Sequence, residues 1–293
     1  MPKISVVIFS FNFENYLEEC IESVLAQTLG PFEVIICDDC SSDESWTIIS
    51  EYAGKFPVLI KPYRHERNIG MQRNGNFGLM KAKGELVSWL DGDDRWLPRK
   101  LELEWKALQN CPDARIAYSN VYTIDTAGNR TGIWHVKNGP NPPVGDVFVE
   151  VFSRRFFNNT SSLFRNELVH HSVYDEVGYF DENVEIFIDY DLKLRATSQF
   201  LVTYSGQPLI EYRFHEQGIH NSPPENLDRD QLYVYKKNLH LLDSRPEQEA
   251  IEIKRQWTAF EQHVKNADNI ITCTCPHCKE TLNISHEGSW QCP

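Results

Sequence analysis

Three aspartates within four positions mark the stretch LVSWLDGDDRWLP, residues 86–98. Carboxylates this close repel one another, so Asp91, Asp93 and Asp94 suggest a bound cation. Hard divalent cations such as Mg²⁺ or Mn²⁺ prefer carboxylate oxygens and leave coordination positions open for substrate phosphates. Gly92 allows a tight turn and the close approach of a ligand. The alternative interpretation is a solvated acidic loop or a set of helix caps.

Two further acidic pairs could serve a site or only the local structure. Asp38 and Asp39 come directly after an apolar run, where Asp is also a common turn and cap residue. Asp189 and Asp191 open a helical segment, FIDYDLKLR. Taken alone, this second pair is best explained as carboxylates that stabilise the first turn through the helix dipole.

Buried strands alternate with helices over the first 110 residues. Four apolar runs have strand length and the continuous hydrophobicity of strands buried on both faces, namely ISVVIFS, FEVIICDD, PVLIKPY and ELVSWL. Apolar residues at helical spacing follow the first two runs, a helix is expected over 70–82, and RKLELEWKALQN forms the next one. This order predicts an open, mainly parallel α/β sheet flanked by helices. Ligands bind outside the carboxyl ends of such strands, which is where the first two acidic clusters lie.

Several local features carry finer expectations. Ser41 or Ser42 is a candidate cap for the second helix, and Pro98 suits the first turn of the helix after the aspartate cluster. The segment TSSLFR, residues 160–165, should contain a strand. LVTYSGQPLIEYRFHE, residues 201–216, resembles a pair of strands.

Bulk composition excludes some classes of function. The formal net charge is −13, from 29 basic and 42 acidic residues. Nucleic-acid binding calls for a basic face, so we expect no nucleic-acid partner. The apolar run near the N-terminus is too short for a signal peptide or a membrane span. We therefore expect a cytoplasmic protein without a transmembrane segment, which docks at most peripherally on the inner face of the membrane. The sequence does not indicate the oligomeric state.

Composition also divides the chain into three segments. Residues 1–220 form the α/β domain, residues 221–270 are charged and helical in pattern, and residues 271–293 are rich in cysteine. Clustered cysteines in a cytosolic protein bind metal more often than they form disulfides. Four of them are candidate ligands of a structural Zn²⁺ in a partial zinc ribbon, namely Cys273, Cys275, Cys278 and Cys292. The chain stops where a second knuckle should end, which favours the front part of a longer protein, and unliganded cysteines are the alternative.

The assembled motifs resemble the family 2 glycosyltransferases of the GT-A fold over roughly residues 3–215. The opening SVVIFSFNFENYLEECIESVLAQTLGPFEVIICDDCSSDES is similar to that family's first strand and its Asp-Asp-x-Ser turn. RNIGMQRNGNFGLMKAKGELVSWLDGDD resembles its Asn-x-Gly stretch and Asp-x-Asp motif. NNTSSLFRNELVHHSVYDEVGYFDENVEIFIDYDLKLR resembles the acceptor-side segment, and YRFHEQGIHNS the closing strand and loop.

The resemblance implies transfer of a sugar from a nucleotide-diphosphate donor with inversion at the anomeric carbon. It implies that Asp91 and Asp93 hold Mn²⁺ or Mg²⁺ on the diphosphate, that Asp189 is the general base, and that Asp191 is the fallback base. Arg213 and His215 fall where the closing segment can approach the diphosphate. The resemblance places the following residues around the nucleotide: Phe9, Ser10, Phe11, Asn12, Asp39, Arg67, Asn76, Asp91 and Gly92.

Three positions depart from the family pattern. Ile188 replaces the Glu that often precedes the base, so Asp189 needs another source of orientation. Asn74 and Gly75 replace the usual Ala-Arg, so a basic contact to the donor is lost or is taken by Arg73 or Arg67. Cys40 replaces the usual glycine after the aspartate pair, which affects the geometry of that turn.

The resulting hypothesis is a metal-dependent, inverting glycosyltransferase that builds a surface polysaccharide or glycoconjugate. A UDP-sugar donor is favoured by analogy with the family, and a glycan or lipid-linked acceptor is expected. One alternative is a nucleotidyltransferase, although FSFNFENY offers no Gly-rich, basic phosphate loop. The other alternative is a non-catalytic sugar- or nucleotide-binding module derived from a transferase.

Overall fold

The chain divides into two compact units. The computed structural model describes residues 1–133, 142–153, 166–216, 218, 224–268, 270–274 and 281–285. The first unit spans Met1–Asn221 and the second Ser222–Pro293. All the acidic clusters identified above lie in the first unit, so this unit carries the candidate site.

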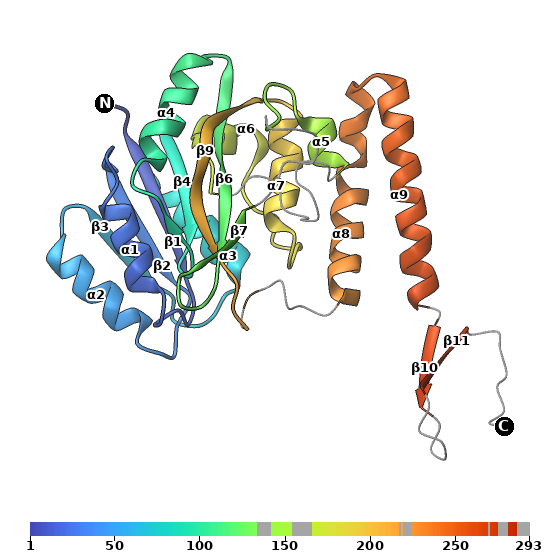
Figure 1. Cartoon of the computed structure of the whole chain (residues 1–293), viewed down its shortest axis with the longest axis horizontal. Coiled ribbons are helices and arrows are strands. Elements are labelled where there is room, and N and C mark those ends of the chain that lie inside the picture. Colours follow the sequence, from blue (N-terminus) through green and yellow to red (C-terminus); the bar gives the residue numbers. More distant parts are fainter. Residues whose placement is uncertain are drawn as a thin grey trace. The chain divides into compact units, whose positions relative to one another are not determined.

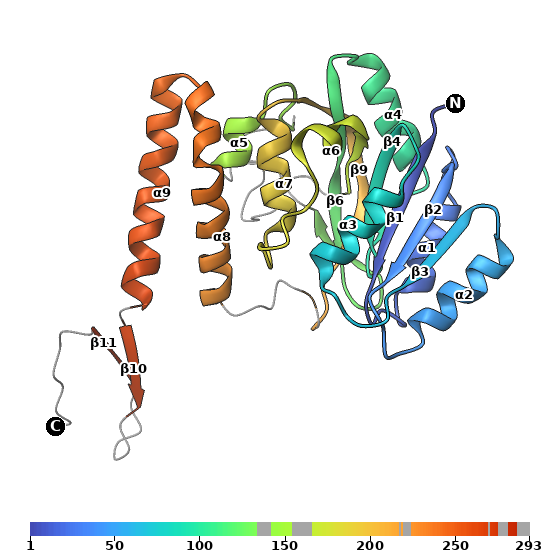
Figure 2. The ribbon, with the colours of Figure 1, turned by 180° about the vertical axis from the view of Figure 1, so that it is seen from behind.

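The first half of unit 1 is a parallel sheet with the strand order β3-β2-β1-β4. Its strands are β1 (Ile4–Ser10), β2 (Glu33–Asp38), β3 (Ile60–Arg64) and β4 (Leu86–Asp91). The connecting helices are α1 (Leu17–Leu25), α2 (Ser45–Lys55) and α3 (Met71–Lys81). Helices α1 and α3 cover opposite faces of this sheet (Figures 1 and 2). Every residue of β1 and β2 is buried, as their continuous apolar sequences predict.

Strands of both directions extend this sheet in the second half of unit 1: the β6–β9 pair is parallel, and the other added pairs are antiparallel. The order continues β4-β8-β6-β9-β5, with β7 beside β6. The added strands are β5 (Arg95–Trp96), β6 (Ala114–Ile124), β7 (Arg130–Ile133), β8 (Leu168–His170) and β9 (Leu201–Arg213). The helices are α4 (Lys100–Asn110), α5 (Phe148–Phe152), α6 (Ser172–Val177) and α7 (Ile188–Thr197). The sheet is thus mixed, with its parallel half at the N-terminal side.

Strand register brings the acidic ends of the strands together. Phe9 of β1 lies between Cys37 of β2 and Asp91 of β4, and Ser10 is level with Asp38. These residues are the last or next-to-last of their strands. The carboxyl edge of the sheet therefore holds both acidic clusters, as expected for an open α/β sheet.

Helix α3 lies close to the sheet because glycine faces it. A Cβ atom built at Gly78 would lie 2.5 Å from Cγ1 of Val7 and 3.0 Å from Sγ of Cys37. Real Cβ atoms do not approach other atoms that closely, so any larger residue would push the helix outward. The glycine explains how a helix with few large apolar residues packs against two fully buried strands.

Three local expectations are wrong. The segment 201–216 is not a pair of strands, because β9 is a single strand over Leu201–Arg213. The register of β9 against β6 shifts at several points along this strand. Neither Ser41 nor Ser42 caps α2, whose N-cap is Glu44. Pro98 precedes α4, which begins at Lys100 after its N-cap residue Arg99. The strand expected at 160–165 lies outside the described residues.

The second unit contains a helical pair and a small hairpin. Helix α8 (Pro224–Asn238) is followed by a 3₁₀ segment (Leu239–Ser244) and by α9 (Glu247–Asp268). Tyr235 of α8 stacks on Trp257 of α9 with 4.5 Å between the ring centroids. Strands β10 (Ile270–Thr274) and β11 (Thr281–Ser285) pair antiparallel. No helix in the described part of the chain is long and apolar enough to cross a membrane.

Candidate active site

A cavity of about 460 Å³ opens at the carboxyl edge of the sheet in unit 1. Residues from the ends of β1, β4 and β9, from the turn after β2, and from the first turns of α3 and α7 line it. They include Phe9, Ser10, Phe11, Asn12, Asp39, Asn74, Trp89, Asp91, Asp93, Ile188, Asp189 and Tyr212. The cavity therefore has carboxylates on the β4 loop, in the turn after β2 and on α7.

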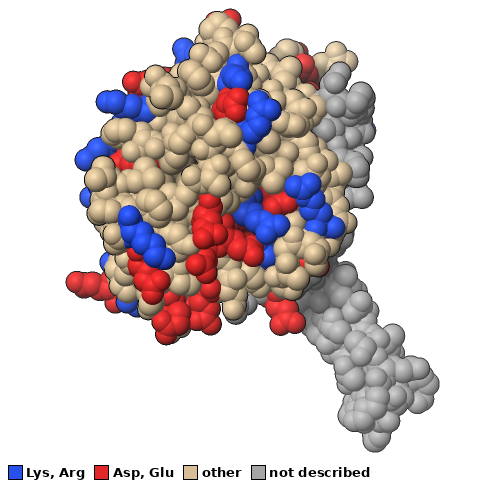
Figure 3. All heavy atoms as spheres, turned by 60° about the vertical axis from the view of Figure 1, so that its left-hand side comes forward, with Lys and Arg blue, Asp and Glu red and all other residues tan. Residues whose placement is uncertain are grey.

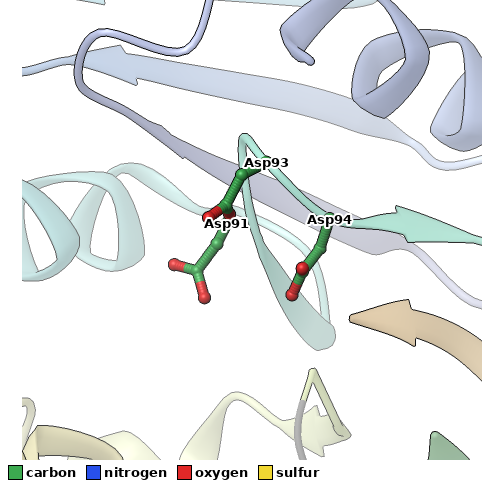
Figure 4. Close-up of side chains that lie close together, drawn as sticks. All are labelled: Asp91, Asp93 and Asp94. Carbon is green, nitrogen blue, oxygen red and sulfur yellow. The ribbon is translucent and has the colours of Figure 1, made fainter. Parts of the chain in front are cut away.

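The loop after β4 gathers three carboxylates. One oxygen each of Asp91, Asp93 and Asp94 lies within 4.8 Å of the others, and Figure 4 shows Asp91 and Asp93 side by side. Oδ1 of Asp93 is buried and has no hydrogen-bond partner among the described residues. A buried, unpartnered carboxylate oxygen is costly unless a cation binds it. The donor set of Asp91 and Asp93 thus suits a hard divalent cation.

Asp94 has a different environment from its two neighbours. Its Oδ1 accepts a hydrogen bond from the backbone N–H of Arg213 at 2.9 Å, and the residue is 1% exposed. It does not line the cavity, whereas Asp91 and Asp93 do. Asp94 therefore ties the acidic loop to the end of β9.

Gly92 lets this loop fold tightly against β1. A Cβ atom at this position would lie 3.0 Å from the carbonyl oxygen of Phe9, 3.0 Å from Cδ2 of Phe13 and 3.1 Å from Cδ1 of Leu17. The Gly92 N–H also donates to the Phe9 carbonyl at 2.8 Å. The glycine thus fixes the spacing between the two candidate metal ligands on either side of it.

We expect Gly92→Ala to lower the free energy of unfolding by about 1–3 kcal/mol, because the added methyl group forces the loop away from β1. The affinity for Mn²⁺ should fall as well, since Asp91 and Asp93 flank the displaced residue. Urea unfolding and calorimetric Mn²⁺ titration measure the two effects. Gly54→Ala in α2 is the matched control, because a Cβ atom there meets nothing within 4 Å. Equal free energies of unfolding and equal Mn²⁺ affinities in the two variants would contradict the expectation.

Asp39, which directly follows β2, is part of the cavity wall. The backbone N–H groups of Ile69 and Gly70 donate to its two carboxylate oxygens at 2.7 Å and 2.9 Å. The residue is 2% exposed and still lines the cavity. Its neighbour Asp38 points elsewhere, accepting hydrogen bonds from Ser41, and burial raises the pKa of its carboxyl group.

Asp189 is the carboxylate that α7 presents to the cavity. Its Oδ1 accepts the N–H of Tyr190 at 2.8 Å, and its Oδ2 lies 3.4 Å from Nζ of Lys193. Its side chain is 16% exposed. A carboxylate in the first turn of a helix, reachable from a cavity, has the position that a general base requires.

Asp191, the predicted fallback base, lies in a different environment from Asp189. Its side chain is fully buried, and Oδ2 accepts from Nε and Nη2 of Arg195 at 3.0 Å and 2.8 Å. The same guanidinium donates to the carbonyls of Val177 and Tyr179 at the end of α6. Asp191 therefore anchors α7 to α6, and its role as a fallback base stays a prediction that its burial does not favour.

Comparison with known proteins shows which family this chain belongs to. The model for the family described as glycosyl transferase family 2 matches residues 5–179, more than half of the chain. The chain belongs to glycosyl transferase family 2. The matched residues include the turn after β2 and the acidic loop after β4, and they end before α7.

Relatives of this family 2 glycosyltransferase occur in several bacteria. An uncharacterized protein of Mycobacterium tuberculosis (strain ATCC 25618 / H37Rv) is 32% identical over 225 residues, which is 75% of this chain and 61% of the relative. An uncharacterized glycosyltransferase of Rickettsia felis is 29% identical over 223 residues, 74% of this chain and 35% of the relative. The chain thus spans less than two thirds of the length of these relatives.

Solved structures show the same fold. TarS 1–349 of S. aureus in complex with UDP-GlcNAc has a TM-score of 0.69 and 18% identity, covering 89% of this chain and 73% of TarS 1–349. The complex of TarS 1–349 with UDP has a TM-score of 0.65 and 18% identity, covering 88% and 70%. The likeness shows that this family 2 glycosyltransferase has the GT-A fold.

Phe11 and Asn12 begin the loop after β1 in this glycosyltransferase and line the cavity with Phe9 and Ser10. Asn12 has a φ of 57°, and its Oδ1 accepts the N–H of Ser42 at 2.8 Å. Its own N–H donates to Oγ of Ser41 at 2.9 Å. The loops after β1 and β2 therefore hold each other, which fixes the wall where the resemblance places the nucleoside.

Cys40 adopts the backbone conformation of the glycine that it replaces. Its φ is 62°, in the left-handed region that favours glycine. A residue with a side chain pays about 1–2 kcal/mol there. Cys40 thus keeps the turn geometry that glycine would give, and it does so with some backbone strain.

Arg213 and His215 reach the acidic loop from the end of β9. The guanidinium of Arg213 is 1% exposed and donates to the carbonyls of Asp93, Asp125 and Thr126 and to a carboxylate oxygen of Glu19. It does not line the cavity, so a role on the diphosphate stays a prediction that its burial does not favour.

His215 is bound to the acidic loop directly. Its Nε2 lies 2.8 Å from Oδ2 of Asp93, and its side chain is 4% exposed. The ring packs against Tyr16 and Phe13. His215 therefore holds one oxygen of Asp93, and the other is the buried oxygen for which the described part of the chain supplies no hydrogen-bond partner.

Asn76 is a structural residue in this domain. Its amide group and the backbone of Phe180 exchange two hydrogen bonds of 2.9 Å and 2.8 Å, and the residue does not line the cavity. The contact of Asn76 with the nucleotide stays a prediction that these two hydrogen bonds and its position outside the cavity lining do not favour. Arg67 is exposed beside the cavity residue Asn68, and Arg73 pairs with Glu182 at 2.9 Å.

Tyr212 and Trp89 are among the cavity residues that were not assigned to the site from sequence. Tyr212 precedes Arg213 on β9, and alternation along the strand turns its side chain toward the cavity. Trp89 of β4 stacks on Phe9 with 5.6 Å between the ring centroids. The signal available in the sequence for Trp89 was its place next to the end of β4.

The tail contributes nothing that can be compared with the zinc prediction. Cys275, Cys278 and Cys292 lie outside the described residues, and Cys273 belongs to β10. The structural zinc site stays a prediction.

Proposed function

We propose that this domain transfers a sugar from a nucleotide-diphosphate donor, with UDP favoured, to a hydroxyl group of a glycan or lipid-linked acceptor, with inversion. The carrying observation is that one cavity joins the Asp91–Asp93 pair on β4 to the carboxylate of Asp189 on α7. A carboxylate pair that can hold a cation against the phosphates and a separate base are the two parts that a metal-assisted single displacement uses. Membership of glycosyl transferase family 2 supports the same reaction class.

The donor would lie along the β1 and β2 side of the cavity. Asp39 and the backbone of residues 9–12 form this wall, and the rings of Phe9 and Phe11 supply apolar surface for a base. The UDP and UDP-GlcNAc complexes of TarS, which has the same fold, support a uridine donor. The net charge of −13 and the isolated basic groups on the face drawn in Figure 3 agree with a small-molecule donor rather than a nucleic acid.

Asp91 and Asp93 would hold Mn²⁺ or Mg²⁺ next to the donor diphosphate. The bound cation would supply positive charge against the negative charge that develops on the leaving diphosphate. His215 keeps one Asp93 oxygen in place and Gly92 sets the spacing of the pair. These contacts preorganise the loop, so little reorganisation is needed when the donor binds.

Asp189 would accept the proton of the acceptor hydroxyl. The acceptor oxygen forms a bond to the anomeric carbon while the bond from that carbon to the phosphate oxygen breaks. The electron pair of the broken bond leaves with the nucleoside diphosphate, and the acceptor proton goes to a carboxylate oxygen of Asp189. One displacement from the face opposite the leaving group inverts the configuration.

The cellular setting follows from this chemistry. Nucleotide sugars are polar donors, and we propose a cytoplasmic reaction in surface polysaccharide or glycoconjugate synthesis. With a lipid-linked acceptor, the domain would work at the inner face of the membrane through peripheral association.

Calorimetric titration of the whole chain with UDP, GDP and dTDP, with and without Mn²⁺, tests the donor part of the proposal. We expect Mn²⁺-dependent binding of UDP and at least about tenfold weaker binding of the others, a difference of about 1.4 kcal/mol. Equal binding of all three would reject the uridine assignment. Failure of all three to bind would reject the transferase and favour a non-catalytic module.

A further inference from the structure

Lys193 is a buried cation behind the cavity wall. It lies one helical turn after Asp189 on α7, and its side chain is 2% exposed. Its Nζ is 3.4 Å from Oδ2 of Asp189 and 3.7 Å from Oε2 of Glu167. The ammonium also lies 5.9 Å from the ring centroid of Trp89, which lines the cavity while Lys193 does not.

A buried lysine at this position is expensive for the fold. Its neighbours on α7, Leu192 and Leu194, are apolar core residues, so a methionine or leucine would meet the packing requirement alone. An isolated buried ammonium costs several kcal/mol, and opposite charges offset that cost only in part. The presence of a cation at this position is therefore not explained by packing alone.

Lys193 belongs to a chain of alternating buried charges. Beyond Glu167 the network continues to Lys100 on α4, whose Nζ contacts Glu104 at 2.7 Å and donates to Oγ of Ser88 at 2.8 Å. Burial raises the pKa of Glu167, and the cations of Lys193 and Lys100 oppose that rise. Three segments of unit 1 thus supply the network, and only its Asp189 end reaches the cavity.

We propose that Lys193 is a positioning residue for the base, holding one oxygen of Asp189 so that the other edge of the carboxylate faces the acceptor. This inference rests on the proposed role of Asp189. The side chain of Ile188 cannot orient the base by a polar contact, and the Tyr190 N–H donates to Oδ1 at 2.8 Å. The ammonium of Lys193 supplies the second fixed point, which stops the carboxylate from rotating out of the attack geometry.

Lys193→Met should lower kcat about 10- to 100-fold, because misplacing a reacting group by about 1 Å costs up to about 10²-fold. The KM for the donor should change less than about twofold, since Lys193 does not line the cavity. The assay follows UDP release from UDP-glucose, UDP-galactose and UDP-GlcNAc in Mn²⁺ with water as acceptor. Lys100→Met is the matched control, because it removes an equally buried ammonium from the same network without touching Asp189.

The outcomes separate this inference from the proposed function. Loss of kcat in Lys193→Met, with near wild-type kcat in Lys100→Met, supports the positioning role. Equal losses in both would show that the network serves folding only, and wild-type kcat in Lys193→Met would overturn the inference while Asp189→Asn stays inactive. Full activity of Asp189→Asn would overturn the base assignment and the positioning role together.

Discussion

Asp189→Asn should lower kcat about 10³-fold while the Kd for UDP in Mn²⁺ stays within about twofold of the wild type. A positioned general base contributes about 10²–10⁴-fold, and asparagine cannot accept the proton of the acceptor hydroxyl. UDP affinity should persist because the Asp91–Asp93 loop and Asp39, on other walls of the cavity, are unchanged. Single-turnover measurement of UDP release, with calorimetry of UDP binding, gives both quantities.

Asp191→Asn is the matched control for this prediction. It removes the same charge from the same helix two positions away, where the carboxylate binds Arg195 in the core. We expect a loss of about 1–3 kcal/mol in the free energy of unfolding, and a kcat of the folded protein within about threefold of the wild type. A larger fall of kcat in Asp191→Asn than in Asp189→Asn would reverse the assignment of the base.

The parallel half of the sheet could be predicted because its strands are buried on both faces. Continuous apolar runs such as ISVVIFS are typical of central strands, and the glycine and proline residues between the runs indicate where the helices begin and end. The acidic ends of β2 and β4 then follow from topology alone. This part of the fold needs no knowledge of which side chains contact one another.

The second half could not be predicted in the same way. Strand β6, ARIAYSNVYTI, buries Ser119 and Asn120, whose hydroxyl and amide groups are satisfied by partners distant in sequence or by the local backbone. Sequence pattern gives no warning of such partners. In β9 the Gly206 region has the signature of a turn, yet the strand continues past it because Gly206, with a φ of 95°, accommodates an irregularity instead.

The same limit applies to the site. Residues that lie at strand ends, such as Asp39, Asp91 and Asp93, could be placed at the cavity from their order. Asn76 and Arg213 could not, because their roles depend on burial and on backbone partners at Phe180 and Asp93 that no motif specifies. A polar residue within a family motif is therefore a weak predictor of ligand contact unless the backbone around it leaves its polar atoms unused.

Asp93→Asn should abolish Mn²⁺-dependent binding of UDP and lower kcat/KM about 10³-fold. The variant replaces a charged ligand atom by an amide, and loss of several kcal/mol of cation stabilisation corresponds to this factor at about 1.4 kcal/mol per tenfold. Asp93 is singled out because it combines a buried Oδ1 that has no hydrogen-bond partner among the described residues with a place in the cavity lining, which Asp94 does not share. Calorimetry with and without Mn²⁺ measures the binding.

Two further variants decide what such a loss means. Asp113→Asn removes an exposed carboxylate just before β6, at the opposite edge of the sheet, and should leave Mn²⁺ affinity unchanged. Asp94→Asn distinguishes a two-carboxylate site from a three-carboxylate site. Asp94 already accepts the Arg213 N–H and does not line the cavity. We therefore expect Asp94→Asn to lower the free energy of unfolding more than it lowers the affinity for Mn²⁺. Equal loss of Mn²⁺ binding in Asp94→Asn and Asp93→Asn would mean that all three carboxylates bind the cation. In that case the hydrogen bond from the Arg213 N–H on β9 to Asp94 would have to break when the cation binds.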